Sequence, residues 1–208
     1  MLKNGIVKPS LSVYNSPLLI VSNAAKQSKR LVVDLWGVNE TMTDLYTPLI
    51  KIEDLAESLA ETNPKFFCSL DLLKGYMQVH VHELDQEIFS FSTKQGHFKY
   101  TRMPFGSKQS GQVFCAIIQD VFKGLSPLRL LSYVDDVLLH SHTFEHMLES
   151  MELVFQRLRQ HRFYLNPAKC EFMRPTVNFL GFVVSEKGIA PRPDRIKALL
   201  DLKPPQNA

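Results

Sequence analysis

Residues 131–139 read Leu131-Ser132-Tyr133-Val134-Asp135-Asp136-Val137-Leu138-Leu139, which places two adjacent aspartates inside an apolar run. Apolar residues with β-branched valines beside the acids predict two short buried strands that meet at the aspartate pair. Burying an unpaired carboxylate is costly, so the two acids require either solvent or a cation. An exposed turn is the simpler interpretation, because aspartate side chains commonly bond the backbone of turns. The rest of the chain has to decide between a cation site and an exposed turn.

Composition places the chain among globular proteins. It has 208 residues and 45% hydrophobic content, enough for a buried core in one or two domains. The net charge of +3 is too small to demand an acidic partner. The three cysteines, Cys68, Cys115 and Cys170, are widely separated, which disfavours a disulfide framework and favours a reducing compartment. No apolar run reaches the roughly 18 to 20 residues that span a bilayer. We therefore expect a soluble intracellular protein with no membrane partner.

Hydrophobic periodicity predicts a chain in which strands and helices alternate without a βαβ rhythm. The longest helix begins after Thr143, which stands at its N-cap. Strands are predicted at residues 17–21, 30–34, 66–71, 77–83, 88–91, 97–103 and 177–184, and helices at 51–61, 107–123, 144–158 and 194–202. The expected fold class is α+β, with antiparallel strands that carry helices on one side.

Two strand-borne acidic positions stand out in this pattern. Asp71 ends the strand at 66–71, and Asp135 with Asp136 lies at the tip of the later hairpin. If they meet, three carboxylates without histidine or thiolate describe a site for hard divalent cations such as Mg²⁺. Such a site suits two metals ~3.5 to 4 Å apart and the chemistry of phosphoryl transfer.

Five segments occur in the order and at the spacings of a known family. They are Asn4-Gly5-Ile6-Val7-Lys8-Pro9-Ser10 with Ser16-Pro17-Leu18-Leu19-Ile20-Val21; Phe67 to Val79, which includes Asp71-Leu72-Leu73-Lys74-Gly75-Tyr76; Thr101 to Lys108; Tyr133-Val134-Asp135-Asp136; and Leu165 to Phe172 with Asn178-Phe179-Leu180-Gly181. Together they resemble a reverse transcriptase domain of a Ty3/gypsy-like long-terminal-repeat retrotransposon polyprotein. The resemblance favours a metal site over a plain exposed turn at Asp135-Asp136.

The resemblance implies a right-hand polymerase with fingers and palm, an antiparallel palm sheet, and no thumb. It places the fingers at about residues 1–64 and 84–106, the palm at about 65–83 and 107–190, and the start of the thumb connection at 191–208. Asp71, Asp135 and Asp136 match the catalytic carboxylates that hold two Mg²⁺ ions, with Mn²⁺ as a possible substitute. Leu72 matches the residue whose backbone carbonyl joins the metal ligands.

Five further residues match the family's nucleotide-binding positions: Arg30, Tyr76, Phe105, Gly106 and Lys169. Arg30 would clamp the triphosphate, because a guanidinium binds phosphate bidentately. The Tyr76 ring would clash with a 2′-hydroxyl and so favour dNTPs, although an ordinary core tyrosine is the alternative. Lys169 would protonate the departing pyrophosphate, and a solvated surface lysine is the alternative.

Further implications concern partners. Phe179, Leu180 and Gly181 match the family's primer grip, so the expected partners are a template–primer of RNA or DNA and dNTPs. The thumb and RNase H regions of a larger polyprotein would be additional parts, and the location would be cytoplasmic or particle-associated, with the nucleus also possible. The chain departs from the family at Ala24 to Ser28, at Trp36 and at Gln109-Ser110-Gly111.

Two functional hypotheses therefore stand. The first is an RNA-directed DNA polymerase core, and the second is an inactive or domesticated fragment that binds nucleic acid without polymerising. A third, an RNA-templated RNA polymerase, shares the carboxylate geometry. The pattern His140-x-His142-x-x-x-His146 could serve zinc in principle, but we interpret these residues as solvated or capping histidines.

Overall fold

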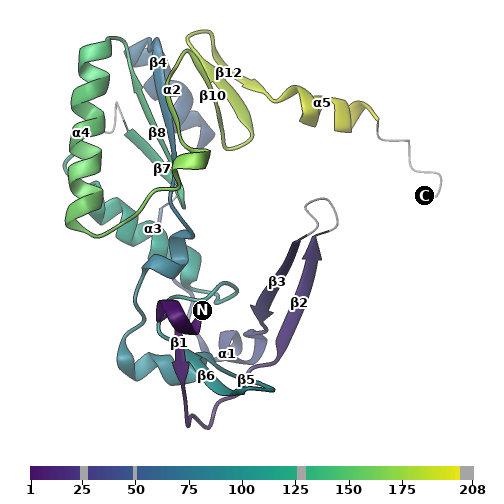
Figure 1. Ribbon diagram of the computed structural model, residues 1–208. Coiled ribbons are helices and arrows are strands. Elements are labelled where there is room, and N and C mark those ends of the chain that lie inside the picture. Colours follow the sequence, from purple (N-terminus) through teal and green to yellow (C-terminus); the bar gives the residue numbers. More distant parts are fainter. Residues whose placement is uncertain (24–27, 49–50, 126–129, 202–208) are drawn as a thin grey trace. The chain divides into compact units, whose positions relative to one another are not determined.

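The computed structural model describes residues 1–23, 28–48, 51–125 and 130–201 (Figure 1). The chain divides into two compact units, each built from two separate segments. The first unit comprises residues 1–48 and 73–120, and the second comprises 49–72 and 121–208. The assignment of residue ranges to fingers, palm and thumb connection stays a prediction.

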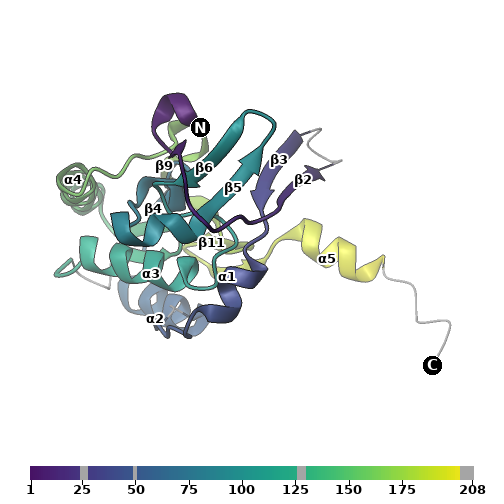
Figure 2. The same cartoon turned by 90° about the horizontal axis from the view of Figure 1, so that it is seen from below.

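The first unit contains short strands, short 3-10 helices and two α-helices. In chain order they are η1 (Leu2–Asn4), β1 (Val7–Pro9), β2 (Leu18–Asn23), β3 (Ser28–Val33), α1 (Trp36–Thr41), η3 (Gly75–Gln78), η4 (Glu83–Phe89), β5 (Ser90–Thr93), β6 (Gly96–Tyr100) and α3 (Ser110–Val121). β1, β6 and β5 form an antiparallel sheet, and β2 and β3 form a hairpin (Figure 2). Their shared core is made by Val7, Val33, Leu35, Phe89, Phe91 and Tyr100.

The predicted strand at residues 77–83 was wrong. Its alternating pattern is interrupted because the chain turns instead into η3 and η4, with Lys74 in the left-handed region at φ 51°. Between these turns, Val81 N–H donates to the Thr101 carbonyl and Met103 N–H donates to the Val79 carbonyl. These two backbone hydrogen bonds join Val79 and Val81 to the segment 101–103, but they do not continue into a β-ladder.

The second unit carries the longer strands and the longest helix. Its elements are α2 (Ile52–Thr62), β4 (Phe66–Asp71), β7 (Leu130–Tyr133), β8 (Asp136–Ser141), α4 (Phe144–Gln160), η5 (Pro167–Lys169), β9 (Glu171–Arg174), β10 (Thr176–Phe179), β11 (Phe182–Ser185), β12 (Gly188–Pro191) and α5 (Pro193–Leu200). One antiparallel sheet has the strand order β7-β8-β4-β9, and a second has the order β10-β11-β12.

Different elements cover the two faces of the four-stranded sheet (Figure 1). Successive side chains along a strand point to opposite faces. Cys68 on β4 contacts Met147 and Met151 of α4 through sulfur–sulfur distances of 3.6 Å, so α4 covers that face. The neighbouring position Phe67 points to the opposite face. There it joins a core with α2 and the small sheet, made by Leu55, Leu59, Phe67, Leu131, Leu138, Val177, Phe179 and Val184.

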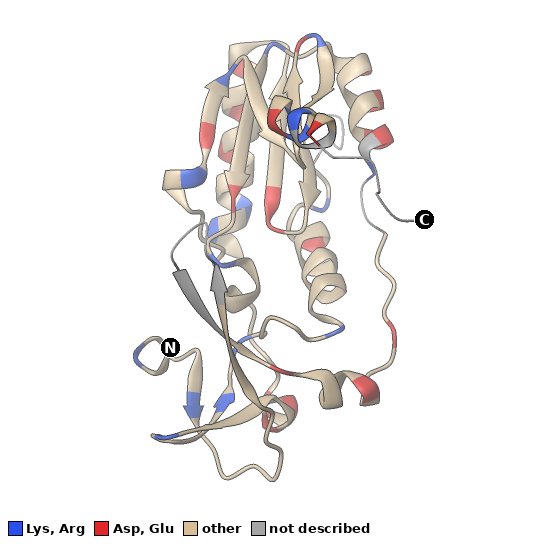
Figure 3. Ribbon diagram, turned by 90° about the vertical axis from the view of Figure 1, so that its right-hand side faces the viewer, with Lys and Arg blue, Asp and Glu red and all other residues tan. Residues whose placement is uncertain are grey.

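The predicted α+β class with an antiparallel sheet is confirmed, but α4 and α2 lie on opposite faces of the four-stranded sheet rather than on one side. Thr143 caps α4 as expected, because its side chain accepts the His146 N–H at 3.3 Å. Among the helices in the described residues, none is long and apolar enough to cross a membrane. Lysine, arginine and acidic residues are interspersed along the ribbon (Figure 3).

Candidate active site

The three predicted carboxylates come together in the second unit. Asp71 ends β4 and Asp136 begins β8, and the two residues are direct partners in the antiparallel register. Directly opposed residues share a face, with Cβ atoms roughly 5 Å apart. Asp135 lies in the adjoining turn, where its carbonyl accepts the Leu72 N–H at 3.0 Å. Residues 64 positions apart therefore form one acidic cluster.

The hairpin that presents the acids is tight. Tyr133 pairs with Asp136, so only Val134 and Asp135 form the loop between β7 and β8. Val134 has φ 54°, a left-handed conformation that β-branched residues rarely adopt. The buried strands around it, with Val137 and Leu138 fully inaccessible, hold the backbone in this conformation. The predicted meeting of two buried strands at the acids is confirmed.

The electrostatics of the cluster are set by burial, by mutual repulsion of the acids and by one cation. Burial raises the pKa of the Asp136 carboxyl, and the charges of Asp135 and Asp71 raise it further, whereas Lys169 lowers it. Lys169 Nζ lies 2.8 Å from Asp71 Oδ2. That hydrogen bond raises the pKa of Lys169, which keeps the ammonium charged beside the acids.

A segment that precedes β9 holds the backbone of Asp71 in place. Asn166 N–H donates to the Asp71 carbonyl at 2.8 Å, and the Asp71 N–H points to Cys170 Sγ at 3.5 Å. Next to these bonds, Leu165 forms an isolated antiparallel β-bridge with Leu72. Burial raises the pKa of the Cys170 thiol, so the sulfur is a neutral acceptor here. The role of Cys170 was not predicted, because nothing local in the sequence signals a contact across 99 positions.

Three carboxylates are ligands of the kind that hard divalent cations prefer. In the described part of the chain, no three His, Cys, Asp or Glu side chains stand close enough to hold a metal ion. Lys169 occupies one oxygen of Asp71 instead. The repulsion that raises the pKa of Asp136 is the feature that a bound cation would relieve.

Three of the predicted nucleotide-binding residues form a cluster in the first unit. The Tyr76 ring lies 5.2 Å from the rings of Phe105 and Phe114, at 55° and 82° to them. Gly106 has φ 92°, and its carbonyl accepts the Asn39 side-chain amide at 2.9 Å. Tyr76 is therefore fixed by two aromatic contacts, and Phe105 remains 49% exposed.

The other nucleotide-binding predictions have different outcomes. Arg30 lies on β3 opposite Val21, but its side chain falls outside the described part of the structure. Lys169 lies at the acidic cluster in the second unit, where its side chain is 63% exposed. The structure thus joins Lys169 to the carboxylates and gives no side-chain contact for Arg30.

The predicted primer-grip residues form the turn between β10 and β11. Phe179 is buried and pairs with Phe182. Leu180 and Gly181 both have positive φ, at 50° and 82°, as a two-residue hairpin turn requires. A Cβ at Gly181 would overlap the guanidinium of Arg195. The positive φ of the turn is what favours glycine here, because the end of the flexible Arg195 side chain could move away.

The three histidines near the aspartate pair do not form a zinc site. His140 is completely buried, with Nε2 3.1 Å from Ser58 Oγ and Nδ1 3.1 Å from Thr62 Oγ1. The expectation of a solvated or capping residue was wrong for His140, because β8 carries it under α2. His142 does cap, since its Nδ1 lies 2.8 Å from the Asn63 carbonyl at the end of α2.

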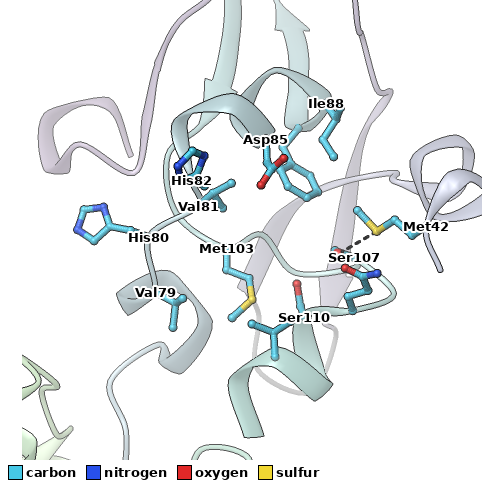
Figure 4. A pocket seen from close by; sticks show the side chains of 13 residues that line it. Met42, Val79, His80, Val81, His82, Asp85, Ile88, Met103, Ser107 and Ser110 are labelled. Carbon is cyan, nitrogen blue, oxygen red and sulfur yellow. Dashed lines mark hydrogen bonds between the residues drawn. The ribbon is translucent and has the colours of Figure 1, made fainter. Parts of the chain in front are cut away.

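A cavity of about 330 Å³ lies in the first unit and was not predicted (Figure 4). Its apolar wall includes Val79, Met103 and Ile88, and its polar side includes Asp85 and Ser110. No sequence signal marked it, because its lining comes from Met42 just after α1, from η4 and α3, and from the segments around residues 80 and 103.

Comparisons with known proteins identify the family of this fold. Residues 8–184 match the family described as reverse transcriptase (RNA-dependent DNA polymerase). The chain is 34% identical over 213 residues to the retrovirus-related Pol polyprotein from transposon 412 of Drosophila melanogaster, a match that covers 100% of this chain and 17% of that protein. The corresponding polyprotein from transposon gypsy is 33% identical over 211 residues, with 99% of this chain and 20% of that protein covered.

A solved structure is also similar. The foamy viral protease-reverse transcriptase in complex with dsDNA aligns with a TM-score of 0.85 and 25% identity, covering 98% of this chain and 42% of that one. The chain spans about a fifth of the length of the curated relatives it matches. It belongs to the reverse transcriptase family. The predicted resemblance to the long-terminal-repeat retrotransposon type is confirmed.

Proposed function

We propose that this chain is the core of an RNA-directed DNA polymerase that joins dNTPs to a primer 3′-hydroxyl on an RNA or DNA template. The observation that carries the proposal is the direct pairing of Asp71 with Asp136, with Asp135 in the adjoining turn. Membership of the reverse transcriptase family supports it. The foamy viral relative bound to dsDNA supports a template–primer as partner.

The carboxylates of Asp71, Asp135 and Asp136, with the Leu72 carbonyl, would hold two Mg²⁺ ions, for which Mn²⁺ could substitute. When bound, such ions activate the attacking hydroxyl and stabilise the leaving oxygen. The protein's part is to fix the positions of the acids. Asp71 is held at its N–H and its carbonyl, and Asp136 begins a buried strand, so little reorganisation is required during the reaction.

Lys169 would supply a proton to the departing pyrophosphate. Its ammonium stands beside Asp71, and its raised pKa means that the side chain carries its proton at neutral pH. General acids of this kind act through a positioned side chain within hydrogen-bond reach of the leaving group. The short helix η5 places the lysine at the cluster.

Selection of the nucleotide would fall to the aromatic cluster and to Arg30. The Tyr76 ring, held between Phe105 and Phe114, would exclude a 2′-hydroxyl by contact. Gly106 would let the backbone approach the nucleotide closely, and Arg30 would bind its triphosphate.

The primer strand would be held by the turn between β10 and β11, through Phe179, Leu180 and Gly181.

The experiment is primer extension with oligo(dT) on poly(rA), dTTP and Mg²⁺. Replacing Asp135 by Asn removes a charge at nearly constant shape, so we expect the rate to fall by orders of magnitude, roughly 10² to 10⁴. The matched control is Asp120→Asn, which makes the same change at an exposed position on α3 and should leave the rate unchanged. Equal rates for wild type and Asp135→Asn would refute the proposal.

Two other outcomes identify the remaining hypotheses. Binding of template–primer without incorporation would indicate the inactive or domesticated module. Incorporation of UTP in preference to dTTP would indicate an RNA-templated RNA polymerase. The two nucleotides are therefore tested in parallel with the same wild-type chain.

A further inference from the structure

The side chain of Arg195 lies against the turn that joins β10 to β11. Arg195 belongs to the first turn of α5, and its guanidinium occupies the place where a side chain at Gly181 would stand. A Cβ at Gly181 would be only 2.1 Å from Cζ of Arg195 and 2.3 Å from each of its terminal nitrogens. Both segments belong to the second unit. A cationic side chain therefore stands beside the turn predicted as the primer grip.

The charge of this guanidinium is not neutralised within the described part of the chain. None of the ion pairs between described residues includes Arg195, and the residue is exposed. Arg192, three positions earlier, gives the contrast. Its Nε lies 3.0 Å from Asp194 Oδ1, and its Nη2 lies 2.9 Å from Asp194 Oδ2. One arginine of this segment is thus paired with a carboxylate through two hydrogen bonds, whereas the other can pair with a ligand.

The turn beside Arg195 and the acidic hairpin pack on the same hydrophobic core. Leu180, which precedes Gly181 in the turn, and Tyr133 both pack against the buried cluster between α2 and the two sheets. Tyr133 is the residue that pairs with Asp136 at the start of the acidic loop. The turn and the carboxylates are therefore parts of one packed unit. A nucleic-acid strand bound at the carboxylates can extend onto the turn without leaving this unit.

The chemistry of an unpaired guanidinium favours a phosphate as its ligand. The planar fork of arginine donates two parallel hydrogen bonds, which match two oxygens of one phosphate. A primer presents one such group at every nucleotide, each with a negative charge. Because the net charge of the chain is only +3, an arginine without a carboxylate partner is one of few places where a phosphate gains a full opposite charge.

We propose that Arg195 binds a phosphate of the primer strand beside the turn between β10 and β11. The inference rests on the proposed function, because the primer is the ligand. Contacts to phosphates fix the position of a strand and carry no information on its base sequence. Arg195 therefore binds primers of every sequence alike and takes no part in the transfer of the nucleotide. It adds a charged contact to a turn whose other predicted primer-grip residues are uncharged.

Fluorescence anisotropy of the full chain with a labelled RNA–DNA template–primer, at several salt concentrations, tests the proposal. Arg195→Gln should weaken binding by about tenfold at low salt. It should also make the slope of log affinity against log salt shallower by about 0.9, because one phosphate contact is lost. Arg195→Lys keeps the charge and should keep the slope. The matched control is Arg192→Gln, which makes the same change where Asp194 already pairs with the guanidinium, and its slope should equal that of wild type.

Neutral primers locate the contact. Single primer phosphates are replaced in turn by uncharged methylphosphonates, and at one position or more the replacement should weaken binding of wild type but not of Arg195→Gln. Equal salt slopes for these two chains, or equal responses to every methylphosphonate, would overturn the inference and leave the polymerase proposal intact, because incorporation of dTTP tests that separately. Binding with the expected slopes but without incorporation would overturn the polymerase proposal alone. A wild type that does not bind template–primer would overturn both.

Discussion

Val134 is the residue whose backbone conformation is least expected from its type. It has φ 54° in the turn that carries Asp135, where a β-branched side chain crowds its own backbone. Strained backbone of this kind clusters at functional sites, where surrounding structure enforces it. Here the enforcement comes from the paired strands β7 and β8, so the position of the acids is maintained at a cost in stability.

We expect Val134→Asn to raise the free energy of unfolding by about 1 kcal/mol, because asparagine tolerates the left-handed region. Urea denaturation measures the change. The matched control is Val183→Asn on β11, a half-buried strand position with no positive φ, where the same substitution should destabilise. Equal destabilisation at both positions would show that Val134 carries no strain.

At the scale of elements, His140 joins β8 to α2. Thr62 Oγ1 donates to the Ser58 carbonyl at 2.7 Å, so His140 Nδ1 donates to Thr62 Oγ1 and Nε2 accepts from Ser58. Both ring nitrogens are thus satisfied in the neutral form. Burial lowers the pKa of His140 to about 4, because no charged partner compensates for desolvation.

This burial predicts a loss of stability in acid. In the unfolded chain His140 binds a proton below its ordinary pKa of about 6.5, whereas the folded chain resists protonation until about pH 4. The unfolded state therefore binds more protons within that window, and acidification favours unfolding. The contribution of His140 to the free energy of unfolding should fall by about 3 kcal/mol between pH 6.5 and 4.

Denaturant titrations at a series of pH values measure this loss. His140→Gln should show a flatter pH dependence than wild type by that amount, since its amide does not titrate. His142→Gln replaces an exposed histidine on the same segment and should follow the wild-type curve. A wild-type curve that matches the His140→Gln curve between pH 4 and 6.5 would contradict the prediction.

At the scale of the whole molecule, the charge balance bears on nucleic-acid binding. The net charge is only +3, and charges of both signs are interspersed (Figure 3). Affinity for template–primer must therefore come from a limited set of phosphate contacts. Each neutralised phosphate contributes a slope of about −0.9 to the dependence of log affinity on log salt concentration.

We expect affinity for an RNA–DNA template–primer to fall by at least about tenfold between 50 and 200 mM salt, which corresponds to two or more phosphates. Fluorescence anisotropy with a labelled primer measures it. Asp135→Asn should bind with the same or a steeper salt dependence, since it removes a negative charge. Affinity that does not change with salt would exclude phosphate contacts as the source of binding.

Local pattern predicted most of the elements. β4, α2, the hairpin of β7 and β8, and the cap of α4 are short-range features, and each follows from residues adjacent in the chain. The strand predicted at 77–83 failed because Val79 and Val81 alternate in a segment that turns at both ends. His140 was misjudged because its burial depends on α2, which lies about 80 positions earlier in the chain.

The sequence by itself determined the acidic hairpin, the family, and the identity of the three carboxylates, because these depend on residue types at short, ordered spacings. Only the tertiary structure decided that Asp71 stands directly opposite Asp136, that Cys170 and Asn166 hold the Asp71 backbone, and that Lys169 pairs with it. These are contacts between residues distant in the chain, and strand register and helix packing, rather than local preference, bring them together.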